Sequence, residues 1–153
     1  MLNLELKIPP LLIVAIVAGL MTLVAYVSPN IHLPWMLRYG TVAILIFSSF
    51  IFALSGLYSM FSAKTTVNPH KPKATSHLVT TGIYEYTRNP MYISFALWLI
   101  AWPVYLSNIW CLLLFPVFIG YMSRYQIIPE EKTLAELFGN DFIAYKNSVR
   151  RWL

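Results

Sequence analysis

Long apolar stretches, separated by short polar segments, constrain this chain more than any other feature. Between Ile8 and Ala63 only Arg38 is charged, and residues 89–123 contain no Asp, Glu, Lys or Arg. Charged residues make up 11% of the chain, against about 25% in an ordinary soluble domain. Apolar runs of this length are typical of membrane-spanning helices. The sequence therefore predicts an all-α integral membrane protein.

The apolar stretches predict four transmembrane helices within a single membrane domain, residues 1–153. Their expected bounds are about 10–27, 39–61, 91–106 and 109–127. The last two stretches are separated by a link of only a few residues, which joins antiparallel neighbours. We therefore expect the third and fourth spans to form a helical hairpin.

The basic residues indicate the orientation. Lys64, Lys71, Lys73 and Arg88 precede the hairpin, and five more basic residues follow it. The hairpin returns to its starting side, and the link between its two spans carries no charge. We expect the protein to lie in a cell (inner) membrane. The positive-inside bias then places both termini and the polar segments around the hairpin on the cytoplasmic side. The same bias accounts for the net charge of +5, so we predict no nucleic-acid partner, and no metal site is predicted.

The tail after residue 128 predicts a cytosolic amphipathic helix. Pro129 suits the first helical position, and Glu130 and Glu131 suit the first turn, where acids face the positive end of the helix dipole. An apolar stripe at helical spacing follows: Leu134, Leu137, Phe138, Phe142, Tyr145 and Val149. We expect Gly139-Asn140 to break or kink this helix, and Arg150-Arg151-Trp152 to anchor it at the membrane interface.

The segment His77–Tyr92 is polar although apolar stretches flank it, and it predicts a site. Gly82 permits a turn with positive φ after an extended, β-branched run. The helix start at Arg88 and Asn89 offers donors for a carboxylate or phosphate. Aromatic side chains in the segment can close over a cation such as a sulfonium.

The same residues also permit a purely structural interpretation. Arg88 is then a positive-inside charge, Asn89 a helix cap, and the glutamates Glu130 and Glu131 a solvated helix start. From the residues alone the two interpretations have about equal weight.

The run LVTTGIYEYTRNPMY, followed by a hairpin and then PEEKTLAELFGNDFIAYKNSVRRW, resembles the isoprenylcysteine carboxyl methyltransferase family. That family belongs to a wider group of membrane methyltransferases, which includes phospholipid N-methyltransferases. The resemblance covers about residues 76–153, which would form the catalytic part. It implies an integral membrane enzyme that uses S-adenosylmethionine, held between the last membrane helices and the cytosolic tail.

Matching positions carry the family's cofactor contacts onto this chain. The resemblance implies that residues 77–79 meet the adenine end largely through backbone and that Tyr84 lines the pocket. Asn89 stands where the family's RHPxY motif has histidine, and Glu130 matches the glutamate that contacts the cofactor. In the gapless match Ser76, and not His77, falls at the family's first histidine. The implied cofactor-binding residues are His77, Leu78, Val79, Gly82, Tyr84, Arg88, Asn89, Pro90, Met91, Tyr92 and Glu130.

Three further residues are predicted for catalysis or for the acceptor: Glu131, Arg124 and Gln126. Gln126 stands where the prenylcysteine enzymes have an arginine that is proposed to face the substrate carboxylate. Arg124 lies two residues earlier, about 160° away around an ideal helix. An amine or thiol acceptor must first lose a proton, for which Glu131 or a tyrosine is a candidate base.

The predicted acceptor is amphiphilic or lipid-like, such as a prenylated small molecule, and reaches the site from the membrane lipids. A phospholipid headgroup and a small thiol are alternatives for the same enzyme. A membrane reductase and a non-enzymatic scaffold subunit are alternatives of other classes. The sequence leaves the acceptor and the oligomeric state open.

Overall fold

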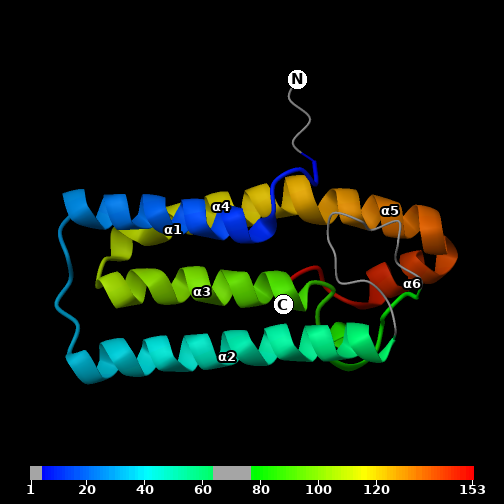
Figure 1. Ribbon diagram of the computed structural model, residues 1–153, viewed down its shortest axis with the longest axis horizontal. Helices are drawn as coiled ribbons and strands as arrows, with labels where there is room; N and C mark the ends of the chain where they lie inside the picture. Colours follow the sequence, from blue (N-terminus) through cyan, green and yellow to red (C-terminus); the bar gives the residue numbers. More distant parts are fainter. Residues whose placement is uncertain (1–4, 64–76) are drawn as a thin grey trace.

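The computed structural model describes residues 5–63 and 77–153, and the regular structure of these two stretches is helical (Figure 1). The three longest helices are α1 (Pro10–Val27), α2 (Trp35–Ser62) and α3 (Pro90–Leu106). The shorter elements are the 3₁₀-helices η2 (Gly82–Glu85) and η3 (Ile109–Leu114), α4 (Phe115–Met122), the π-helix η4 (Ser123–Ile127), α5 (Ile128–Phe138) and α6 (Asn140–Ser148). The all-helical prediction is confirmed for the described residues, whereas Lys64, Lys71 and Lys73 lie outside them.

Three helical stretches are long and apolar enough to cross a membrane, namely α1, α2 and the stretch Ile109–Phe138. The helix α3 is apolar but shorter, with 17 residues. Only Ser49 and Gly56 of α2 are buried, and most of its large apolar side chains are exposed. Lipid rather than water suits such a surface, and the chain is an integral membrane protein.

The helix α3 lies at the centre of the bundle, between α2 on one side and α1 and α4 on the other (Figure 1). The core between α1, α3 and α4 is built on Met21, Leu99 and Phe118, each at most 1% exposed. Against α2, a side-chain carbon added to Gly56 would lie 3.1 Å from Cγ of Pro90. This small residue lets the backbones of α2 and α3 approach closely.

The chain reverses direction after α3, as the hairpin prediction requires. Ser107 ends α3 in the left-handed conformation, with φ of 53°. Nδ2 of Asn108 donates to Oγ of Ser28 at 2.8 Å, which ties this turn to the end of α1. Arg38, near the start of α2, donates to the carbonyl of Tyr105. These contacts hold together the end of the bundle opposite α5 and α6 (Figure 1).

The helix that carries the tail begins earlier than predicted, because α4, η4 and α5 follow one another without a break. The helix α5 has Pro129 in its first turn, with Glu130 and Glu131, as predicted, but it continues directly from η4 and is not preceded by a break. A proline inside a helix lacks an N–H, and its ring clashes with the carbonyl four residues earlier, here that of Tyr125. The π-helical turn accommodates this residue, and the carbonyl of Tyr125 accepts from the N–H of Leu6 at 3.0 Å. The lead segment before α1 thus satisfies the group that Pro129 cannot.

The tail itself is two helices. Gly139, with φ of 52°, separates α5 from α6, so the predicted break is confirmed. Most of the predicted apolar stripe packs with Tyr84 into a small cluster, whereas Leu137 is exposed. The stripe residues in that cluster are Leu134, Phe138, Phe142, Tyr145 and Val149. The tail therefore packs against the polar segment that precedes α3.

Candidate functional site

The segment 77–89 and the tail meet at one end of the bundle, where α3 and α5 begin (Figure 1). The hydroxyl of Tyr92, in the first turn of α3, donates to Oε1 of Glu130 in α5 at 2.5 Å. The hydroxyl of Tyr145, in α6, donates to the backbone carbonyl of Tyr84 at 2.7 Å. The two polar regions singled out in the sequence thus lie side by side.

The turn that leads into this site requires glycine. Gly82 has φ of +67°, and a side-chain carbon there would lie 2.9 Å from Oγ of Ser59 in α2. The N–H of Gly82 donates to Oε1 of Glu85 at 3.3 Å, which closes the turn η2. Tyr84 follows and is buried. Burial raises the pKa of Tyr84 and also that of Tyr145, so both phenols stay neutral at ordinary pH.

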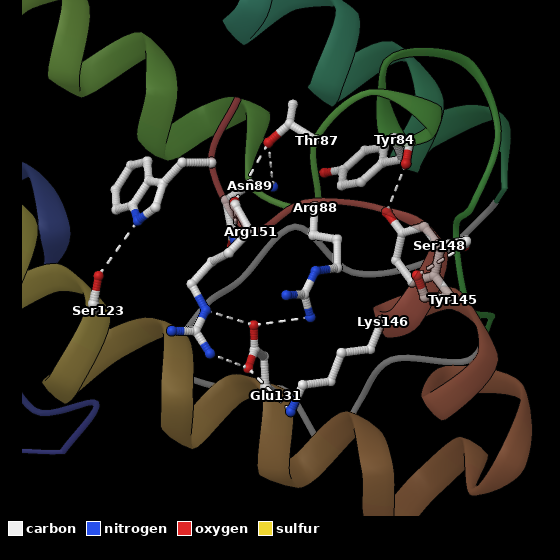
Figure 2. Close-up of polar contacts among 11 residues, drawn as sticks. Tyr84, Thr87, Arg88, Asn89, Ser123, Glu131, Tyr145, Lys146, Ser148 and Arg151 are labelled. Atoms are coloured by element: carbon white, nitrogen blue, oxygen red, sulfur yellow. Dashed lines mark hydrogen bonds and ion pairs between the residues drawn. The ribbon is translucent and has the colours of Figure 1, made fainter.

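A cluster of charges surrounds Glu131 (Figure 2). Its carboxylate accepts two hydrogen bonds from Arg151, from Nε at 3.0 Å and from Nη2 at 2.8 Å. Nη1 of Arg88 lies 3.0 Å from the same carboxylate, and both of these side chains are only 9% exposed. Nζ of Lys146 lies farther away, at 3.7 Å. One buried acid therefore holds three cations, one of them buried with it.

Positive charge and donors remain in excess in this cluster. Burial lowers the pKa of Arg88, and Glu131 opposes that effect. The hydrogen bonds to Glu131 raise the pKa of Arg151. Nη1 of Arg88 is paired by charge but not aligned for a hydrogen bond, and Nε of Arg88 also has no hydrogen-bond partner among the described residues. Buried donors of this kind fit an anionic group such as a carboxylate.

Asn89 is the N-cap residue of α3, as the structural alternative expects, but its side chain makes no capping hydrogen bond. Its Nδ2 instead donates to the backbone carbonyl of Arg151 at 2.8 Å. The hydroxyl of Thr87 lies 3.5 Å from the same carbonyl and accepts from the N–H of Asn89 at 3.2 Å. The N–H of Arg88 donates to the carbonyl of Arg150 at 3.0 Å. Residues 149–153, which we call the strap, therefore run along residues 87–89.

The other predicted cofactor residues surround this core of the site. Pro90 is buried, and both it and Met91 contact α2. Leu78 and Val79 are half-buried against the small cluster around Tyr84, while His77 is exposed. Ser76 lies outside the described residues.

The side chains of Arg124 and Gln126 contact the segment that precedes α1. Nη1 of Arg124 donates to Oε1 of Glu5 at 3.0 Å. Gln126 is fully buried, and its Nε2 donates to the carbonyl of Ile8 at 2.7 Å. Both residues lie in the π-helix η4, so the ideal-helix angle between them does not apply. Their predicted role towards the acceptor stays a prediction.

Sequence reasoning missed Arg151, Tyr145 and Lys146. Arg151 binds Glu131, and Nε1 of Trp152 donates to Oγ of Ser123 at 3.4 Å. The interface-anchor role of residues 150–152 stays a prediction. One signal was present: neither Glu130 nor Glu131 has a basic residue three or four positions away. Acids without such a helical partner can be paired by more distant residues, as Glu131 is by Arg88 and Arg151.

Comparison with known proteins gives a consistent family. A family model described as phospholipid methyltransferase matches residues 37–141. An uncharacterized protein of Haemophilus influenzae is 41% identical over 63 residues, which are 41% of this chain and 100% of that protein. The protein-S-isoprenylcysteine O-methyltransferase of Saccharomyces cerevisiae is 37% identical over 78 residues, 50% of this chain and 33% of that enzyme.

The human protein-S-isoprenylcysteine O-methyltransferase is 31% identical over 94 residues, 60% of this chain and 33% of that enzyme. The chain thus spans only a third of the length of these two relatives. No solved structure matches.

Proposed function

The chain belongs to the phospholipid methyltransferase family, and we propose that it is an integral membrane methyltransferase that uses S-adenosylmethionine to methylate an amphiphilic acceptor. The observation that carries this proposal is the meeting of two separate segments at one end of the bundle. Tyr92 donates a hydrogen bond to Glu130, and Arg88 forms an ion pair with Glu131. A buried acid paired with a buried arginine, beside a second acid, is an arrangement that clusters at functional sites.

The residues present fit S-adenosylmethionine. Buried Arg88 has N–H donors available for the carboxylate of the cofactor. Asn89 has an amide oxygen and a second N–H beyond the one that it donates to the carbonyl of Arg151. Tyr84 and Tyr92 offer aromatic faces to a cation. When bound, the cofactor supplies an electrophilic methyl group on its sulfonium. The chain's own residues bind it, orient it and keep water from it.

The predicted general base, Glu131, holds both carboxylate oxygens against cations. We propose that its first role is to hold the site together. A carboxylate acceptor needs no base at all, whereas an amine or thiol acceptor must lose a proton. Glu131 serves as a base only if acceptor binding displaces one of its cations.

We propose that the acceptor enters from the membrane through an open groove of about 680 Å³. It lies between α2 and the turn η2, and Leu54, Tyr58 and Ile83 are among the residues that line it. Apolar and hydroxyl groups share its lining, which suits an amphiphile with a polar end. The names of the relatives support a prenylated cysteine, and the name of the family supports a phospholipid.

We further propose four membrane crossings, with α3 as the third, and a cytoplasmic site. Basic residues gather at the end of the bundle that carries the site, among them Arg88, Lys146 and Arg151. At the opposite end Arg38 donates a hydrogen bond to the carbonyl of Tyr105. This asymmetry follows the positive-inside bias.

Methyl transfer to a panel of acceptors tests the function. Purified protein is incubated with methyl-labelled S-adenosylmethionine and either a farnesylated cysteine analogue, phosphatidylethanolamine vesicles or a small thiol. We expect label in one acceptor class, and none with Glu130→Ala. If wild-type protein neither transfers label nor crosslinks to labelled cofactor, the proposal is wrong and a non-enzymatic role replaces it.

A further inference from the structure

Arg151 contacts two residues that the site needs, and it does so through different atoms. Its carbonyl accepts from Nδ2 of Asn89 at 2.8 Å, and its guanidinium binds both oxygens of Glu131 (Figure 2). Asn89 precedes α3 and Glu131 belongs to α5. Arg151 is therefore a direct link between the two halves of the proposed cofactor site.

The bond to Glu131 has a geometry that only arginine provides. Two parallel N–H groups meet the two carboxylate oxygens, at 3.0 and 2.8 Å. This fork fixes the orientation of the carboxylate as well as its distance, whereas a lysine supplies a single ammonium without that planar fork. The neighbouring residue Glu130 is held to Tyr92 on the same turn of α5. The fork thus limits how α5 can rotate beside α3.

Loss of the Arg151 side chain leaves the buried ion pair in place. Arg88 and Glu131 remain together, each 9% exposed, whereas the side chain of Arg151 is 32% exposed. The backbone bond from the N–H of Arg88 to the carbonyl of Arg150 is also unaffected. A substitution at Arg151 therefore loosens the strap without exposing an unpaired buried charge.

We propose that Arg151 is a positioning residue for the cofactor: its carbonyl and guanidinium hold the strap closed along residues 87–89 and set the orientation of Asn89 and Glu131. The proposal rests on the proposed function, because it concerns the affinity of that same site. It predicts that the guanidinium controls how tightly S-adenosylmethionine is held, and chiefly how slowly it leaves. If Arg151 were merely structural, its substitution would lower the unfolding free energy, but the cofactor affinity of the folded protein would not depend on the two-pronged hydrogen bond to Glu131.

Calorimetric titration with S-adenosylmethionine tests the proposal on three variants. Arg151→Ala is expected to weaken affinity by about tenfold, the factor that one charge-assisted hydrogen bond is worth, with most of the change in the dissociation rate. Arg151→Lys keeps the charge but loses the fork, and its affinity should lie between those of wild type and Arg151→Ala. Arg150→Ala is the matched control, since the side chain of Arg150 is exposed and its contact with Arg88 is made by backbone. It should bind within about twofold of wild type.

The outcomes separate this inference from the function on which it rests. If wild-type protein does not bind the cofactor, the proposed function itself fails. If wild type binds the cofactor and both Arg151→Ala and Arg151→Lys bind it with wild-type affinity, the positioning role is wrong while the function stands. Should Arg151→Ala fail to fold, Arg151→Lys decides alone: affinity equal to that of Arg150→Ala overturns the inference, and reduced affinity at unchanged unfolding free energy supports it.

Discussion

Replacement of Glu131 by glutamine tests whether the ion cluster holds the site together. Glutamine keeps the size of the side chain but removes the charge that Arg88 and Arg151 share. Because Arg88 is 9% exposed, it would remain buried without a counter-charge. Breaking a buried ion pair on one side costs about 3–5 kcal/mol, while the exposed contact with Lys146 is worth less than about 1 kcal/mol. We therefore expect Glu131→Gln to lower the unfolding free energy by about 3 kcal/mol.

Denaturation with SDS in mixed detergent micelles, followed by far-ultraviolet circular dichroism, measures this loss. Lys146→Ala is the control and should lie within about 1 kcal/mol of wild type. Adding Arg88→Met to Glu131→Gln should recover much of the loss, because no buried charge is then left unpaired. A loss for Glu131→Gln no larger than that for Lys146→Ala would refute the buried-pair interpretation.

Three further substitutions probe the surroundings of the site. Gly82→Ala should cost at least about 1 kcal/mol, because φ is +67° and the new methyl group would meet Ser59 at 2.9 Å; an unchanged denaturation midpoint would contradict this. Tyr145→Phe removes the hydrogen bond to the carbonyl of Tyr84 and should cost about 1 kcal/mol, measured in the same way. Arg124→Ala breaks only an exposed ion pair and should change stability by less than about 1 kcal/mol. Its affinity for S-adenosylmethionine should equal that of wild type, and a loss would assign it to the site after all.

Local signals in the sequence were enough for much of the fold. The helix α1 has the bounds predicted from its apolar run, with proline at its start. The helix α2 begins at Trp35, directly after Pro34 and four residues before the predicted span. The left-handed turn at Gly82 and the break at Gly139 followed from the backbone freedom of glycine. Each of these features depends on residues close together in the chain.

The features that sequence reasoning missed depend on partners far away in the chain. Pro129 lies in the first turn of α5 as predicted, but the continuity with η4 and the hydrogen bond from Leu6 to the carbonyl of Tyr125 were not predicted. Arg151 beside a tryptophan predicts an interface anchor, and its hydrogen bond to Glu131, 20 residues earlier, was not predicted. Hydropathy and spacing do not identify the distant partner in such pairs. Only the packing of α6 and the strap against residues 84–89 creates them.

The family and the meeting of the two polar segments could be predicted better than the chemistry of the candidate site. The resemblance to the isoprenylcysteine carboxyl methyltransferases is confirmed by the relatives and by the family model. The convergence of the segment before α3 with Glu130 and Glu131 was also predicted, from the charges on either side of the hairpin. The roles of Arg124 and Gln126 were read from a matched position, and the π-helix that redirects both leaves no local trace in the sequence.

Binding of S-adenosylmethionine to the purified protein tests the central claim most directly. Isothermal titration compares wild type with Glu130→Ala and with Asn89→Ala, on protein whose circular dichroism shows an unchanged helix content. The account predicts binding with one site per chain for wild type and no measurable heat for either variant. If both variants bind the cofactor with unchanged affinity, the site described between α3, α5 and the strap is not the cofactor site.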